Sequence, residues 1–242
     1  MNAVGTVYRR EVRSYFSTPI AYVFIPIQLA ILSFFFFQFS PFFAAERAEM
    51  REFFALMPLM LFIFAPAITM RLWSEELRLG TSEILLTLPM RLREVVFAKF
   101  LAAFTVLCVS LVLTGGIPLT LAWLGNPDWG PVIGGYVGTV LAGAMFISLG
   151  CWVSALSENQ VVSLLIGVAA GMVLVVVCSP GFATYLSGSS PNLARIVEDI
   201  GVISHFSSVE RGVIALGDVV YFLSGTVLFL AMTITTIQAK RY

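Results

Sequence analysis

Residues 53–100 read FFALMPLMLFIFAPAITMRLWSEELRLGTSEILLTLPMRLREVVFAKF and hold an apolar run, a densely charged stretch and the start of another apolar run. A helix needs about 20 apolar residues to cross the hydrocarbon core of a bilayer. Runs of this length recur along the chain, and we expect six spans, at 20–39, 53–72, 97–123, 132–156, 161–179 and 218–238. The sequence therefore predicts an all-α membrane protein in which residues 1–242 form a single transmembrane domain.

The composition supports this class. Apolar residues make up 59% of the chain and charged residues 12%, against about 45–50% and about 25% in soluble domains. The 14 Lys and Arg residues balance the 14 Asp and Glu residues, so no net charge points to a nucleic-acid partner. We expect the lipid bilayer to be the main surroundings, and no nucleic acid.

Basic residues at the ends of the spans indicate the orientation, because loops rich in Lys and Arg stay in the cytoplasm. With both termini inside, ten of the 14 basic residues lie in cytoplasmic segments and four lie outside. The sequence therefore predicts a multi-pass protein with cytoplasmic termini.

Two segments outside the spans have helical patterns. In residues 1–18, apolar residues recur at steps of three and four, with Arg9, Arg10 and Arg13 on other faces, which predicts an interfacial amphipathic helix. A frayed terminus that only carries orientation charges is the alternative. The extracytoplasmic connection 180–217 has an amphipathic pattern before the last span, made by Phe206, Val209, Val213 and Leu216.

Several kinds of chemistry are excluded or disfavoured. The lysines are Lys99, followed by Phe100, and Lys240, followed by Arg241, so no lysine fits a phosphate-binding loop. His205 is the single histidine, which disfavours haem and zinc sites. We therefore expect no catalytic residue, no metal and no cofactor in this chain. The spans hold few ionisable groups, which disfavours a carrier driven by an ion gradient.

The charged segment 70–99 contains a short candidate helix. Gly80 and Pro89 bracket residues 81–88, where Thr81 or Ser82 can cap a helix. Its apolar face would dock into a groove on a soluble partner, or the segment would be a solvated hairpin that packs on its own bundle. The residues alone leave both interpretations open.

The same segment carries a family resemblance. MRLWSEELRLGTSEILLTLP (70–89) followed by LREVVFAKF (92–100) resembles the signature of ABC-2-type permeases: an acidic patch, Gly-Thr, Glu-x-Leu-Leu-Thr-x-Pro and a downstream Lys. LSENQVVS (156–163) and HFSSVERGVIALGDVVYFLSG (205–225) are similar to the gliding-motility-associated branch, with nitrous-oxide-reductase-maturation permeases as near relatives. The resemblance covers essentially the whole chain.

This resemblance implies a permease subunit of an ATP-driven ABC transporter, an exporter in a bacterial cytoplasmic (inner) membrane. Separate ATP-binding subunits would bind ATP and Mg, and a second permease copy, identical or related, would complete the complex; an extracytoplasmic auxiliary subunit is left open. The family's coupling helix falls on Glu75, Glu76, Arg78, Gly80, Thr81, Glu83, Leu85, Leu86 and Pro89.

Small residues mark two places of close helix approach. Gly134 and Gly138 are expected to pack within the chain, whereas Ser163, Gly167 and Gly171 are assigned to the dimer interface because the family's dimers place the first and fifth spans centrally.

Two other classes of function remain. A membrane anchor or assembly scaffold for an ATPase complex would need the same spans and the same charged loop. An autonomous channel or carrier is disfavoured by the scarcity of charge in mid-membrane.

Overall fold

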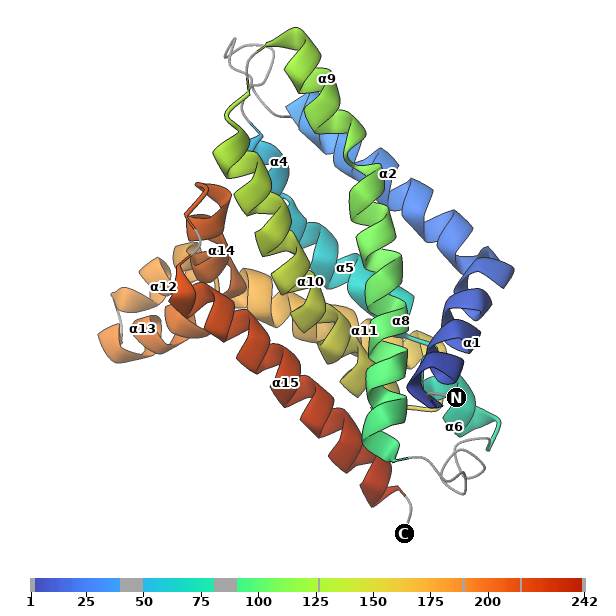
Figure 1. Ribbon diagram of the computed structural model, residues 1–242. Helices are drawn as coiled ribbons and strands as arrows, with labels where there is room; N and C mark the ends of the chain where they lie inside the picture. The colour runs from blue at the N-terminus through green and yellow to red at the C-terminus, as the bar shows by residue number, and fades with distance from the viewer. Residues whose placement is uncertain are drawn as a thin grey trace.

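The computed structural model describes residues 3–39, 50–80, 91–125, 127–188, 190–213 and 215–240, and within these the regular elements are helices (Figure 1). Six helical segments are long and apolar enough to cross a membrane, which confirms the predicted all-α, six-span class. They are Ala21–Gln38, Met57–Arg78, Leu92–Trp123, Trp129–Leu156, Gln160–Val177 and Leu216–Ala239.

The described residues form the following helices in chain order. They are α1 (Ala3–Ser17), α2 (Pro19–Phe39), α4 (Arg51–Ala55), α5 (Met57–Thr69), α6 (Ser74–Arg78), α8 (Leu92–Leu113), α9 (Gly116–Leu124), α10 (Trp129–Leu156), α11 (Gln160–Met172), the π-helix η1 (Val173–Val177), α12 (Pro180–Ser187), α13 (Pro191–Ile200), α14 (Val202–Glu210) and α15 (Leu216–Ala239). Since α8 begins before the predicted start at 97, Lys99 lies inside a helix and not at its end.

Helix α10 lies at the centre of the bundle and contacts α5, α8, α11, α14 and α15 (Figure 1). Its glycines allow this, because helices in lipid gain stability from close van der Waals packing and not from a hydrophobic drive. The ring of Phe54 lies against Gly135, and the side chains of Leu107 and Thr69 lie against Gly143 and Gly150.

Gly134 and Gly138 of α10 pack within the chain, as expected. A Cβ atom at Gly134 would lie 2.9 Å from the carbonyl oxygen of Val209, and one at Gly138 would lie 2.6 Å from Val209 Cγ1. The two glycines therefore allow α14 to pack closely against α10.

Prolines lie in the second and third spans without removing either. Pro58 lies in the first turn of α5 and Pro66 in its interior. The third span breaks between α8 and α9 at Thr114 and Gly115, one turn before Pro118, where the proline lacks the N–H that an uninterrupted helix needs.

The connection 180–217 differs from the prediction, because α12, α13 and α14 fill most of it. The single helix expected from Phe206 to Leu216 is wrong: α14 ends at Glu210, and Gly212 turns the chain with φ 83°. Phe206 and Val209 are buried, whereas Val213 and Leu216 are 60% and 78% exposed. Glu210, the last residue of α14, forms an ion pair with Arg51, with Oε1 2.7 Å from Arg51 Nε.

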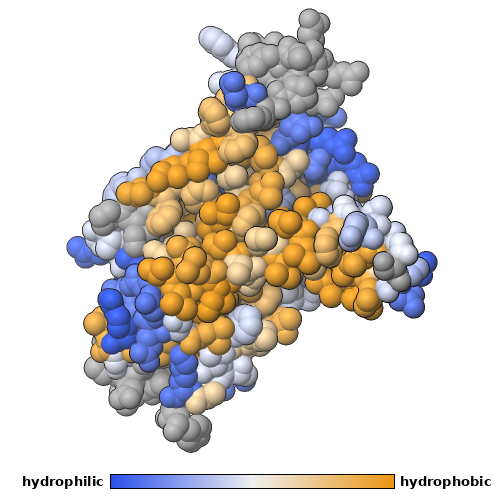
Figure 2. All heavy atoms as spheres, turned by 180° about the vertical axis from the view of Figure 1, so that it is seen from behind, coloured by the Kyte–Doolittle hydropathy of each residue, from blue (hydrophilic) through white to orange (hydrophobic). Residues whose placement is uncertain are grey.

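The outer surface of the bundle is apolar, as a lipid-facing surface should be. Figure 2 shows a broad apolar area across the middle of one face, with hydrophilic residues gathered at its ends. Exposed apolar side chains on α2, α11 and α15 include Phe34, Leu165 and Val227.

We predict that Gly150→Ala destabilises the bundle. The added Cβ would overlap the buried Thr69 hydroxyl, and overpacking of this kind costs about 1–3 kcal/mol. The midpoint of thermal unfolding in detergent should fall. Gly217→Ala is the matched control, because nothing lies within 4 Å of its Cβ position. Equal midpoints for the two variants would contradict the described contact.

Candidate functional site

Lys99 is a fully buried cation at the end of the bundle that carries α6. Its side chain is 1% exposed, and Nζ lies 2.9 Å from Glu76 Oε1 and 3.2 Å from Glu11 Oε1. Nζ also donates a hydrogen bond of 2.8 Å to the carbonyl oxygen of Leu72, and it lies 5.1 Å from the centre of the Trp73 ring. A buried charge is tolerated only with such partners.

Arg10 completes the group of charges. Its Nη2 atom lies 2.7 Å from Glu11 Oε1 and 3.1 Å from Glu76 Oε1. We call Arg10, Glu11, Glu76 and Lys99 the ion cluster. Because α1 contributes Arg10 and Glu11, α6 contributes Glu76 and α8 contributes Lys99, the cluster ties three helices together.

The cluster changes the acidity of Glu11. Burial by itself would raise the pKa of this carboxyl group, but Lys99 and Arg10 outweigh burial and hold its pKa below the ordinary value of 4.5. Glu11 is therefore an ionised carboxylate at neutral pH.

Helix α6 is also fixed to α10, through Ser154. Ser154 Oγ accepts hydrogen bonds from the backbone N–H groups of Trp73 and Ser74, at 3.0 and 3.3 Å. It donates to the carbonyl oxygen of Met70 at 3.2 Å. N–H donors in the first turn of a helix have no partner within the helix. Ser154 Oγ is therefore the acceptor for these N–H groups of α6.

A further hydrogen bond connects α1 to α5. The buried hydroxyl of Tyr15 donates to the carbonyl oxygen of Ile68 at 2.9 Å. Side chains from α1, α8 and α10 thus surround the chain from Ile68 to Glu76, and α6 cannot shift without moving its neighbours.

The structure describes part of the predicted coupling segment. Glu76 belongs to the ion cluster, so its first role is within the chain, whereas Arg78 is exposed and Glu75 is half-buried. Gly80 follows α6 with φ 67°, a left-handed conformation that suits a helix C-terminus. The remaining predicted coupling residues, Thr81, Glu83, Leu85, Leu86 and Pro89, and the expected helix 81–88 lie outside the described residues.

Glu11 was not predicted as a site residue. The sequence pattern indicated a downstream Lys, but the third span was expected to begin only two residues before it. Had Lys99 been placed inside a buried helix, a carboxylate partner would have been required. Nothing in the spacing selects Glu11, which lies 88 positions away along the chain.

The small residues of α11 are used inside the chain. Cβ atoms at Gly167 and Gly171 would lie 2.8 Å from Pro66 Cβ and Phe62 Cβ of α5, and Ser163 is buried on the same helix. Close packing on α5 therefore accounts for their small size. A role for these three residues at a dimer interface stays a prediction.

The motif at 156–163 forms the turn between α10 and α11, next to α6. Asn159 caps α11, its Oδ1 accepting from the N–H of Val161 at 2.9 Å. A hollow of about 360 Å³ separates this turn from Arg78, with Glu158 and Gln160 in its lining. Helix α6 and this turn thus lie on either side of one hollow at the same end of the bundle.

These features define a six-span helical membrane protein whose charged surface is fixed rigidly to the spans and whose lysines fit no phosphate-binding loop. A sequence model of the family described as ABC-2 family transporter protein matches residues 18–236. The chain belongs to this family, whose members are membrane components of ABC transporters and normally not catalytic themselves. Membership implies an ATP-binding partner. No curated protein matches the chain.

We predict that Lys99→Met lowers stability strongly, because it leaves Glu11 and Glu76 with Arg10 as their cation in the cluster. Removing one partner of a buried ion pair costs about 3–5 kcal/mol. Thermal unfolding in detergent is the measurement.

Two variants make this test specific. Adding Glu11→Gln and Glu76→Gln to Lys99→Met should recover part of the loss, since the two groups that lost Lys99 then carry no negative charge. Lys240→Met, at an exposed lysine, is the control for removal of a positive charge. A Lys99→Met variant as stable as this control would show that the cluster does not hold the helices.

Acid should weaken the cluster at Glu11. Because the pKa of Glu11 is lowered in the folded protein, its contribution is present above the ordinary value of 4.5 and is lost as pH falls below that value. The unfolding midpoint of the wild type should therefore fall more steeply with acidification than that of Glu11→Gln. Glu158→Gln, at an exposed turn, should keep the wild-type slope. Parallel curves for wild type and Glu11→Gln would contradict this assignment.

Proposed function

We propose that this chain is the permease subunit of an ATP-driven exporter, powered by a separate ATP-binding subunit that docks on α6 and the connection after it. The observation that carries the proposal is the attachment of α6 to three spans, through Glu76 and Lys99 to α8 and through Ser154 to α10, with α5 directly before it. The family match supports it independently.

The proposed mechanism transmits a displacement. ATP and Mg bind in the partner, whose two copies close on ATP and push α6. Because the ion cluster holds α1 and α8 to α6, and the hydrogen bonds of Ser154 hold α10, the push becomes a rigid-body movement of the spans. Export, and not import, follows from the resemblance of residues 70–100 to the exporter-type loop.

We further propose that two permease copies meet in the membrane. The outward face of α11 exposes Val161, Leu165 and Ile166, while its small residues are already packed on α5. This apolar face of the fifth span is the surface on which we propose that a second copy packs.

The setting we propose is a bacterial inner membrane, which rests on the family resemblance. We place both termini in the cytoplasm because of the distribution of Lys and Arg. Kinship with the gliding-motility-associated branch rests on the motifs at 156–163 and 205–225 alone.

Purification of the tagged chain from its native membrane in mild detergent should recover a stoichiometric ATPase with a phosphate-binding loop. Arg78→Glu should reduce its retention about fivefold, the size expected when one exposed charge contact is reversed. Arg13→Glu, on the exposed face of α1, is the matched control and should retain the partner.

Mass spectrometry and the ratio of the two subunits measure the outcome. A chain that purifies without an ATPase would overturn the docking proposal. Full function in a complex whose ATPase binds but cannot hydrolyse ATP would replace the exporter with a scaffold.

A further inference from the structure

A cleft of about 370 Å³ lies between α1 and the segment from Arg71 to Leu79, beside the ion cluster. It is large enough for a small polar ligand. Its lining outside the cluster includes Ser14 and Thr18 from α1, and Arg71 and Glu75 from the facing segment.

Two of the charged residues in this lining are not part of an ion pair among the described residues. Within the ion cluster, the two cations face two carboxylates at 2.7–3.2 Å. Arg71 and Glu75 remain, and among the described residues neither forms an ion pair. The cleft therefore presents one positive and one negative group to a ligand.

Arg71 is held in place for binding an anion. Its guanidinium lies over the Tyr15 ring, 5.0 Å from the ring centre, and Nη2 donates to Ser14 Oγ at 3.4 Å. Since Ser14 Oγ accepts from Arg71, its own hydroxyl proton is available to a second acceptor. A planar guanidinium and a hydroxyl group together suit a phosphate.

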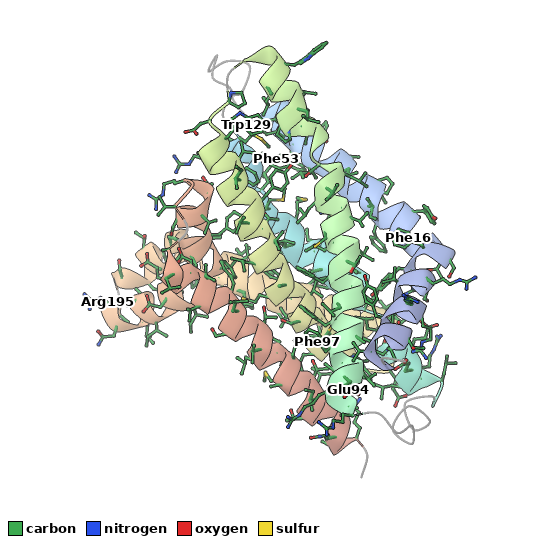
Figure 3. All side chains as sticks on the ribbon, viewed as in Figure 1. Phe16, Phe53, Glu94, Phe97, Trp129 and Arg195 are labelled. Carbon is green, nitrogen blue, oxygen red and sulfur yellow. The ribbon has the colours of Figure 1, made fainter. Side chains whose placement is uncertain are left out.

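The position of the cleft indicates that this phosphate belongs to a lipid. Thr18, at one end of the lining, sits at the corner between α1 and α2, where the first span begins. Phe16, labelled at this corner in Figure 3, contacts Tyr22 edge to face, with ring centres 6.3 Å apart. Tyr22 and Val23 are exposed on α2, and aromatic residues of this kind mark the membrane–water interface.

We propose that the cleft binds the headgroup of a phospholipid that carries both a phosphate and a primary ammonium, as phosphatidylethanolamine does. Arg71 and Ser14 bind the phosphate and Glu75 binds the ammonium, while the acyl chains lie along the exposed face of α2. An anionic glycerol headgroup would offer Glu75 hydroxyl groups but no cation, and a choline headgroup has no N–H to donate. The inference does not depend on the proposed transport function.

The test is native mass spectrometry of the full-length chain in detergent, titrated with phosphatidylethanolamine, phosphatidylglycerol and phosphatidylcholine of identical acyl chains. Phosphatidylethanolamine should bind about fivefold more tightly than the other two, the size of one partly exposed charged contact. Glu75→Gln should abolish this preference without unfolding the chain, because the Glu75 side chain forms no hydrogen bond or ion pair with the described residues. Glu158→Gln, at an exposed turn, should keep it.

A second variant tests the phosphate end. Arg71→Gln should weaken all three lipids alike, whereas Arg13→Gln, an exposed arginine outside the lining, should not. Free inorganic phosphate or glycerophosphoethanolamine at lipid-equivalent concentration should fail to displace the lipid.

Other results would overturn the proposal. Equal or tighter binding of phosphatidylglycerol by the wild type would make this a plain anion site, and so would a preference that survives Glu75→Gln. Displacement by inorganic phosphate would make free phosphate the ligand. Loss of the bound lipid when the ATPase is added back would assign the cleft to the protein partner.

Discussion

The burial of Lys99 is the constraint on which the α6 end of the structure depends. An ammonium group in a helical bundle is stable only where carboxylates and carbonyl oxygens surround it. Glu11, Glu76 and the Leu72 carbonyl meet this need from two other segments. Consequently α1 must lie against α8, and the chain must turn after α5 so that α6 presents Glu76.

This constraint explains why a short helix can matter in a large membrane protein. Helix α6 has five residues and little packing surface of its own. Its position is nevertheless fixed, because charged contacts hold one side and Ser154 satisfies its first backbone donors. A surface that receives a push from a partner needs this stiffness, since a flexible segment would absorb the displacement.

The six spans could be predicted from the sequence because apolar length is a local signal. Interactions between distant segments could not be predicted. Nothing in the spacing pairs Glu11 with Lys99, and the ladder of Gly167 and Gly171 indicates close packing without naming the helix that packs there. The helix expected through Val213 failed because its apolar spacing continues past Gly212, whose positive φ ends the regular structure.

The two ends of the bundle are held by different interactions. At the α6 end, four charges and a set of backbone hydrogen bonds must separate before the helices can part. At the opposite end, α14 is seated on Gly134 and Gly138 by van der Waals contact, and His205 Nδ1 lies 2.8 Å from Asp218 Oδ1 of α15. Removing the partners of a buried charge leaves it with its full desolvation cost. A movement that starts at α6 therefore carries α1 and α8 as one unit.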